Sequence, residues 1–99
     1  MNVSIQLVND TLFISPSGRL DTVNSAELKS KIEADGTTGC DIVFDLSGVE
    51  YISSAGLRLL VALQKQVMAD GKKLTLRNPN KVVSEIFRVA GFNKAFTIE

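Results

Sequence analysis

The chain has 99 residues, of which 44% are hydrophobic and 22% are charged, so the composition excludes a disordered or fibrous protein and predicts one globular domain over residues 1–99. Eleven basic residues balance eleven acidic ones, which leaves no global field to attract nucleic acid or an anionic membrane. The chain has no histidine and a single cysteine, Cys40, which excludes a Ser-His-Asp triad, a Cys-His zinc site and an internal disulfide.

The first strands are predicted from an alternation of apolar and polar residues on both sides of Asn9-Asp10. Such an alternation around a short polar turn is typical of an antiparallel hairpin. We therefore expect the chain to open with two paired strands, in which the apolar positions are Ile5, Leu7, Leu12 and Ile14.

A first helix is predicted after the turn-forming segment at residues 15–21. In the segment 22–36, apolar residues recur among charged ones, and Asn24 and Glu27 have the spacing of an N-cap and its N3 partner. We expect this helix to end near Gly36.

The middle of the chain predicts a central strand and a second helix. The unbroken apolar run at residues 42–44 suits a strand that is covered on both faces or lies deep inside a parallel sheet, with Cys40 as a small apolar residue beside it. From Ser54 to Ala69 the apolar spacing is helical, and Gly71 fits the stop of that helix. The expected apolar positions are Leu57, Leu60, Val61, Val67 and Met68, with Leu59 and Leu63 beside them.

The last third predicts a short strand at residues 72–78 and a third helix. Asn78-Pro79 resembles an N-cap followed by a proline at the first helical position, and Gly91 is expected to stop the helix. The tail from Phe92 adds a short edge strand or docks its aromatic rings on the core. The inward residues of the third helix are expected to be Val82, Val83, Ile86, Phe87 and Ala90.

The order of these elements predicts an α/β fold with a mixed sheet, because strands that alternate with helices pair in parallel through right-handed crossovers. In such sheets, sites gather in loops at the carboxyl ends of strands. Residues 47–56 form the loop that leaves the predicted central strand, so we expect the functional site there.

Ser53 and Ser54 are the unusual residues of this loop. One of them is explained as the N-cap of the second helix, which stabilises the helix by about 1 kcal/mol, but a cap does not require two serines. A nucleophilic serine has no base here, and the loop lacks the glycines and lysine of a phosphate-binding loop. A phosphate acceptor fits, because a helix N-terminus tolerates the added charge while an apolar or acidic partner surface does not.

Three neighbouring residues have simpler interpretations. Gly56 lies one turn into the helix, where glycine costs about 1 kcal/mol relative to alanine, so we expect another backbone to approach closely. Asp21 caps the first helix or pairs with Arg19, and Asp45 fixes its loop as an acceptor. An ordinary solvated surface is expected for Lys72, Lys73, Arg77, Lys81 and Arg88.

Together these motifs resemble the STAS domain of bacterial anti-sigma factor antagonists. The match rests on residues 45–49 (DLSGV) and 51–57 (YISSAGL), preceded by residues 18–21 (GRLD) and followed by Asn78-Pro79 and residues 90–96 (AGFNKAF). The resemblance covers nearly the whole chain in order. It implies a four- or five-stranded sheet with helices packed largely on one face.

The resemblance also implies a non-enzymatic partner-switching protein without a cofactor or a metal. We expect it to be a cytoplasmic monomer or weak dimer that neither binds nucleic acid nor inserts into membranes. No apolar run is long enough for a membrane helix, and the first residues do not resemble a signal peptide. In the family, the unphosphorylated antagonist binds an anti-sigma factor that is also a serine kinase. This binding frees the sigma factor, phosphorylation abolishes it, and a serine phosphatase restores it.

By the resemblance, the phosphorylated serine falls on Ser54, with Ser53 as the alternative. The family usually has aspartate at the position of Ser53 and serine or threonine at that of Ala55. A second possibility is therefore an unphosphorylated STAS subunit or ligand-sensing module of a transporter or stressosome-like assembly. The partner-binding residues implied are Asp21, Ser53, Ser54, Ala55, Gly56, Leu57 and Arg58.

Overall fold

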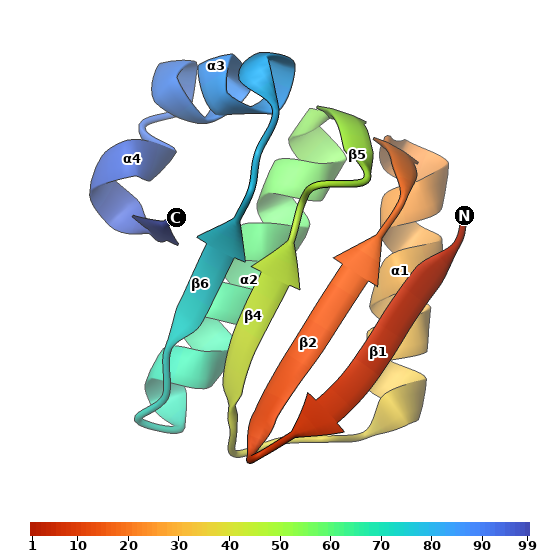
Figure 1. Ribbon diagram of the computed structural model, residues 1–99, viewed down its shortest axis with the longest axis vertical. Helices are drawn as coiled ribbons and strands as arrows, with labels where there is room; N and C mark the ends of the chain where they lie inside the picture. Colours follow the sequence, from red (N-terminus) through yellow and green to blue (C-terminus); the bar gives the residue numbers. More distant parts are fainter.

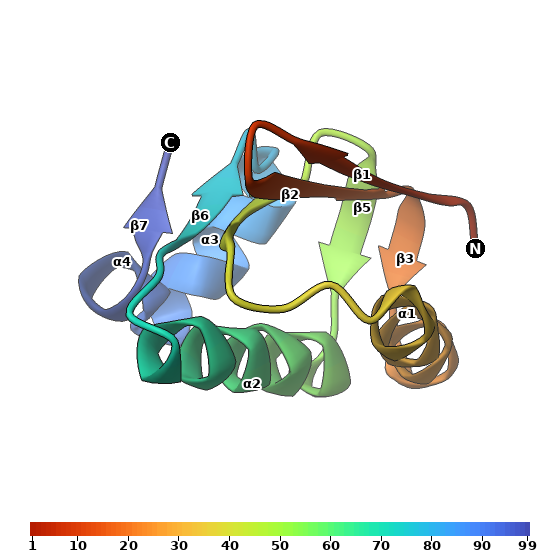
Figure 2. The ribbon, with the colours of Figure 1, turned by 90° about the horizontal axis from the view of Figure 1, so that it is seen from below.

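The main sheet of the protein, described by a computed structural model of residues 1–99, has five strands in the order β1-β2-β4-β6-β7. Figure 1 shows β1, β2, β4 and β6 in this order, and Figure 2 shows β7 beside β6. β1 and β2 pair antiparallel, and every other neighbouring pair is parallel, which confirms the predicted mixed sheet. The strands are β1 (Val3–Val8), β2 (Thr11–Pro16), β4 (Asp41–Asp45), β6 (Leu74–Arg77) and β7 (Thr97–Ile98).

The predicted hairpin is confirmed, with Leu7 opposite Leu12 and Val8 opposite Thr11. Asn9 and Asp10 have φ values of 50° and 62°, so both occupy the left-handed region. Two consecutive left-handed residues form the turn whose twist matches that of antiparallel strands, and asparagine and aspartate tolerate this conformation well.

β4 lies inside the sheet between β2 and β6, both of them parallel to it, as one of the two alternatives predicted. Ile42 and Phe44 point into the core and are buried, whereas Val43 on the opposite face is half-buried. The strand is therefore covered by helices on one face only. Cys40, immediately before it, is buried as a small apolar residue, as expected.

A second sheet was not predicted. β3 (Gly18–Leu20) and β5 (Val49–Ile52) pair in parallel within segments that the sequence analysis assigned to a turn and a loop. Strands of three and four residues are too short to show a clear apolar alternation. Figure 2 shows the two strands side by side, running from the main sheet toward the layer that holds α1 and α2.

The helices α1 (Thr22–Asp35) and α2 (Ser54–Ala69) lie on the same face of the main sheet (Figure 2). α2 has the predicted bounds, and Gly71, with φ of 71°, follows its last turn. α1 ends at Gly36 as predicted, but its N-cap is Asp21 and not Asn24. The amide side chain of Asn24 instead donates to the Arg19 carbonyl at 2.8 Å.

The helix α3 (Lys81–Val89) begins later than predicted, because Asn80 and not Asn78 is its N-cap. Asn80 Oδ1 accepts from the Val83 amide at 2.8 Å, and its Nδ2 donates to the Val49 carbonyl of β5 at 3.1 Å. Asn78 has a left-handed φ of 59°, which turns the chain out of β6. The predicted stop at Gly91 is confirmed, with φ of 77°.

The core contains 19 apolar residues, drawn from both sheets and from the inner faces of all four helices. On α2 the buried side chains include Leu59, Leu60, Leu63 and Val67, whereas Met68 is 64% exposed and Val61 lies at the surface. On α3, Val83 and Phe87 are buried, but Val82 is 53% exposed and Ala90 is also exposed. We predicted Met68 and Val61 on the apolar side of α2, and Val82 and Ala90 on the inner side of α3, and these predictions were wrong. Where apolar residues are adjacent in the sequence, they can form two overlapping apolar stripes on a helix, and only the tertiary packing decides which stripe is buried.

The tail of the chain both docks aromatic rings on the core and adds a short edge strand, which were the two alternatives left open by the sequence. α4 (Phe92–Ala95) buries Phe92, whose ring stacks on Phe87 at 5.3 Å and on Phe96 at 4.3 Å between centroids. β7 then pairs with β6 at the sheet edge. Among the helices, none combines the length and the hydropathy that crossing a membrane requires.

Candidate functional site

The predicted site lies where the chain leaves β3 and β5 and enters α1 and α2. Leu20 stands opposite Ile52 in the parallel register, so the two strands end side by side and both helices begin at the same place. The Ser53 amide donates to the Leu20 carbonyl at 3.0 Å, which extends the pairing by one residue. The fold thus brings the segments of Asp21 and of the two serines together, although they are distant in sequence.

Ser53 is the N-cap of α2. Its hydroxyl oxygen accepts from the Gly56 amide at 3.5 Å and donates to the Leu20 carbonyl at 3.1 Å. The hydroxyl is half-buried, and its hydrogen-bonding capacity is used in joining the helix to β3. Ser53 is therefore a structural residue of the loop.

Ser54 is the first residue of α2 and is exposed. Its hydroxyl takes part in none of the side-chain hydrogen bonds of the protein, unlike that of Ser53. Arg58 lies one turn further along α2, is also exposed, and forms no ion pair. A free hydroxyl therefore stands at the positive end of a helix dipole, one turn from an unpaired cation.

Gly56 confirms the predicted close approach of another backbone. A Cβ built on it would lie 2.8 Å from the Leu20 carbonyl oxygen and 2.9 Å from Cγ2 of Ile52. Both distances are shorter than real Cβ contacts, and the nearer atom belongs to the backbone and cannot rotate away. Glycine at this position lets the first turn of α2 pack directly on the end of β3.

Asp21 has the capping role that was one of its two interpretations. Its Oδ1 accepts from the Asn24 amide at 2.9 Å, and the residue is half-buried. Arg19 does not pair with it but lies over the ring of Tyr51, 4.6 Å from the centroid, across the β3-β5 pair. The other residues predicted to contact a partner differ in exposure, since Ala55 and Leu57 are half-buried and Gly56 is buried.

A groove of about 250 Å³ between the first turns of α1 and α2 was not predicted. Its rim carries the cations Lys29 and Arg58, and the Ser25 hydroxyl beneath it is buried without a hydrogen-bond partner. No pattern in the sequence of α1 indicates that it faces α2, so the groove residues of α1 could not be found beforehand. Ala55 and Arg58 of α2 were already among the predicted partner-binding residues. The groove is lined by Thr22, Ser25, Ala26, Lys29, Ala55, Arg58, Leu59 and Ala62.

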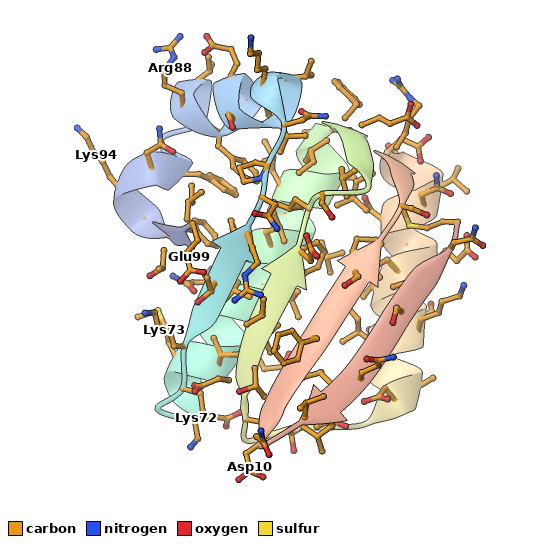
Figure 3. The ribbon with its side chains drawn as sticks, viewed as in Figure 1. Asp10, Lys72, Lys73, Arg88, Lys94 and Glu99 are labelled. Atoms are coloured by element: carbon orange, nitrogen blue, oxygen red, sulfur yellow. The ribbon has the colours of Figure 1, made fainter.

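Asp45 fixes the loop after β4, as predicted. Its Oδ1 accepts from the Ser47 amide at 3.0 Å. This hydrogen bond is the main cause that lowers the pKa of the Asp45 carboxyl, and Arg77 nearby acts in the same direction. Of the predicted solvated basic surface, Lys72, Lys73 and Arg88 are exposed (Figure 3), and so is Lys81. Arg77 is half-buried and pairs with Glu99.

The lowered pKa of Asp45 predicts a loss of stability in acid. A folded-state pKa below the ordinary value of 3.8 stabilises the fold above that value, and the contribution disappears as the pH falls through the folded pKa. We expect Asp45→Asn to unfold more easily than the wild type at neutral pH, and the difference to shrink as the pH falls below 3.8 and through the lowered folded-state pKa of Asp45, measured by urea unfolding. A difference that stays constant with pH would contradict a role for the ionised carboxylate.

The described residues include no group of three or more Cys, Asp or Glu side chains that could hold a metal ion. What the site does offer is a surface made by two helix N-termini, with one uncommitted hydroxyl and a cationic groove beside it. Such an arrangement suits recognition by a partner whose binding responds to a charge added at Ser54.

Known proteins resemble the chain over nearly its full length. A family model described as "Mlab, STAS domain" matches residues 3–98. The protein BtrV of Bordetella bronchiseptica, named as a candidate anti-sigma factor antagonist, is 28% identical over 99 residues, which cover 99% of this chain and 85% of BtrV. The anti-sigma-B factor antagonist of Bacillus subtilis is 24% identical over 98 residues, which cover 99% of this chain and 90% of that protein.

Solved structures share the fold. A candidate anti-sigma factor antagonist from Thermotoga maritima superposes with a TM-score of 0.88 at 22% identity, over 97% of this chain and 84% of the other. The Bacillus cell fate determinant SpoIIAA in its phosphorylated form has a TM-score of 0.74 at 18% identity, over 99% of this chain and 91% of the other. At these identities the structures establish the common architecture.

Proposed function

The chain belongs to the STAS domain family, and on that premise we propose that it is an anti-sigma factor antagonist whose binding is switched off by phosphorylation of Ser54. The names of the relatives support the antagonist role, since both are named as antagonists of anti-sigma factors. The observation that carries the switch is the contrast between the two serines. The hydroxyl of Ser53 is held by Leu20 and Gly56, whereas that of Ser54 is exposed and free.

The position of Ser54 suits a phosphate that leaves the fold intact. A phosphoserine adds a charge of about −1.5 to −2, which the free N–H groups and the dipole of a helix N-terminus stabilise. Arg58, one turn away, supplies a cation that is not already paired. The domain itself therefore tolerates the added charge, whereas binding of a partner that covers Ser54 becomes less favourable.

In this proposal the partner surface consists of the first turns of α1 and α2. Asp21 lies at its border as the cap of α1, and Ser54 lies at its centre. Ala55, Leu57 and Arg58 continue it along α2, while Ser53 and Gly56 hold the turn in position. A partner packed over Ser54 would have to desolvate the phosphate dianion without a cation of its own to offset the lost hydration, and this would release the complex.

Two partners follow from this function. One is an anti-sigma factor with serine kinase activity, which binds the unphosphorylated protein and transfers the γ-phosphoryl group of ATP to the Ser54 oxygen as the hydroxyl loses its proton. The other is a serine phosphatase, which hydrolyses the phosphoserine and restores the free hydroxyl. The protein itself acts as a binding partner and substrate and catalyses neither step.

Mapping the phosphate tests the proposal. After incubation with the cognate anti-sigma factor and Mg-ATP, fragmentation mass spectrometry should place the phosphate on Ser54. Ser54→Ala should accept none, whereas Ser53→Ala, which loses about 1 kcal/mol of capping, should still be modified on Ser54. Phosphate on Ser53, or on neither serine, would contradict the switch.

A second candidate function is that of an unphosphorylated STAS subunit in a larger assembly. The replacement of the usual aspartate by Ser53, and of serine or threonine by Ala55, favours it. In that case a stable complex with a transporter or scaffold protein should copurify, and treatment with phosphatase or kinase should leave it unchanged.

A further inference from the structure

The two edges of the main sheet differ in how they are protected. Edge strands expose unpaired N–H and C=O groups, and proteins usually guard them with short strands, charges or proline. β7 is guarded in this way, because it has two residues, with Lys94 shortly before it and Glu99 directly after it, both labelled in Figure 3. β1, at the opposite edge, has six residues, VSIQLV, without a charge or a proline.

Apolar burial is also incomplete at the β1 edge. On β2, Leu12 and Ile14 are 2% and 0% exposed. Their partners on β1, Leu7 and Ile5, are 55% exposed and half-buried, respectively. The apolar side chains on the inner face of the sheet are thus buried on β2, whereas those at the β1 edge are not fully covered by other residues.

A second copy of β1 is complementary to this edge. In an antiparallel pairing about a two-fold axis centred on Ile5, Val3 faces Leu7, Ile5 faces its own copy and Ser4 faces Gln6. With the axis on Gln6, Ile5 faces Leu7 and Ser4 faces Val8, while Val3 lies beyond the paired residues. The strand carries no charge that could repel its own copy, and the formal net charge of the chain is zero. On the neighbouring α1, Glu27 and Lys31 pair with each other at 3.3 Å, so they present no uncompensated charge.

We propose that β1 pairs antiparallel with β1 of a second copy of this chain, so that two main sheets join into one. The contact is confined to a six-residue edge, well below the roughly 1,000 Å² of a stable interface, so the dimer is weak and depends on concentration. The proposal does not rest on the function of Ser54, because the β3-β5 pair and the α1-α2 groove belong to other parts of the fold.

Sedimentation equilibrium over a range of concentrations tests this pairing. The wild type should show reversible dimer formation, and the double variant Ser4→Lys/Gln6→Lys should weaken it about tenfold or more, because either register then places lysines opposite or diagonal to one another. Both positions are exposed on the outer face of β1, so the hairpin should still fold, which circular dichroism and thermal melting would verify.

The matched control is Gln66→Lys/Asn93→Lys, which adds the same charge at exposed positions on α2 and α4, away from the β1 edge (Figure 1). This variant should dimerise like the wild type. Amide hydrogen exchange should slow with concentration in β1 and not in β7. A wild type that stays monomeric at millimolar concentration, or a dimer that survives the β1 lysines, would overturn the proposal, even if the edge accepts a strand from another protein.

Discussion

Ser54→Asp is expected to weaken binding to the anti-sigma factor by at least about thirtyfold, equivalent to about 2 kcal/mol. The carboxylate would be desolvated under the partner where the serine hydroxyl was neutral, and an unmatched charge in a contact costs several kcal/mol. Isothermal titration calorimetry with the purified anti-sigma factor would measure the change. Ser54→Ala should bind within a few-fold of the wild type, because it adds no charge.

The effect of Ser54→Asp should come from the interface and not from the fold. An acidic residue in the first turn of a helix is favourable by about 0.3–1 kcal/mol, so the melting temperature should stay the same or rise. Ser30→Asp adds the same charge to an exposed position in the middle of α1 and should leave binding unchanged. Tight binding by Ser54→Asp would remove Ser54 from the partner surface and favour the unphosphorylated subunit.

Gly56→Ala is expected to destabilise the protein by about 1–3 kcal/mol, although alanine is the better helix former by about 1 kcal/mol. The new Cβ would meet the Leu20 carbonyl oxygen at 2.8 Å, so α2 must move away from β3. For a domain of this size, each kcal/mol lowers the melting temperature by roughly 4–8 °C. Thermal and urea unfolding of the variant would measure the loss.

The matched control for Gly56→Ala is Gln66→Ala, an exposed position on the same helix, which should change stability by less than about 0.5 kcal/mol. Gly56→Ala should also weaken partner binding, because the shift of α2 separates Ser54 from the cap of α1. If Gly56→Ala were as stable as the wild type, the contact between α2 and β3 would be looser than the distances to Leu20 and Ile52 indicate.

The β1-β2 hairpin and α2 are elements that the local sequence is sufficient to predict. Asn9-Asp10 supports two left-handed residues in a row, and this turn fixes the β1-β2 register without help from the rest of the chain. The bounds of α2 follow from Ser53 before it and Gly71 after it, because a cap acts within one turn of the helix end. These elements were predicted correctly because the interactions that define them are local.

The caps of α1 and α3 were misassigned because several residues of the right type compete. Asp21 precedes α1 and Asn24 lies in its first turn, while Asn78 and Asn80 both precede α3. Asn80 is selected by a contact with the Val49 carbonyl in β5, and Asn24 is drawn to the Arg19 carbonyl in β3. Both contacts depend on the small β3-β5 sheet, which has no clear signal in the sequence.

The amino-acid sequence was enough to predict the α/β class and the position of the loop at Ser53 and Ser54, and to exclude a histidine-based catalytic site. The tertiary structure alone decided which serine is free. Ser53 is held by the Leu20 carbonyl, a group 33 residues away, while Ser54 has no such partner. The reason is physical, since a hydrogen bond across two parallel strands depends on their register, and no pattern within either segment specifies it.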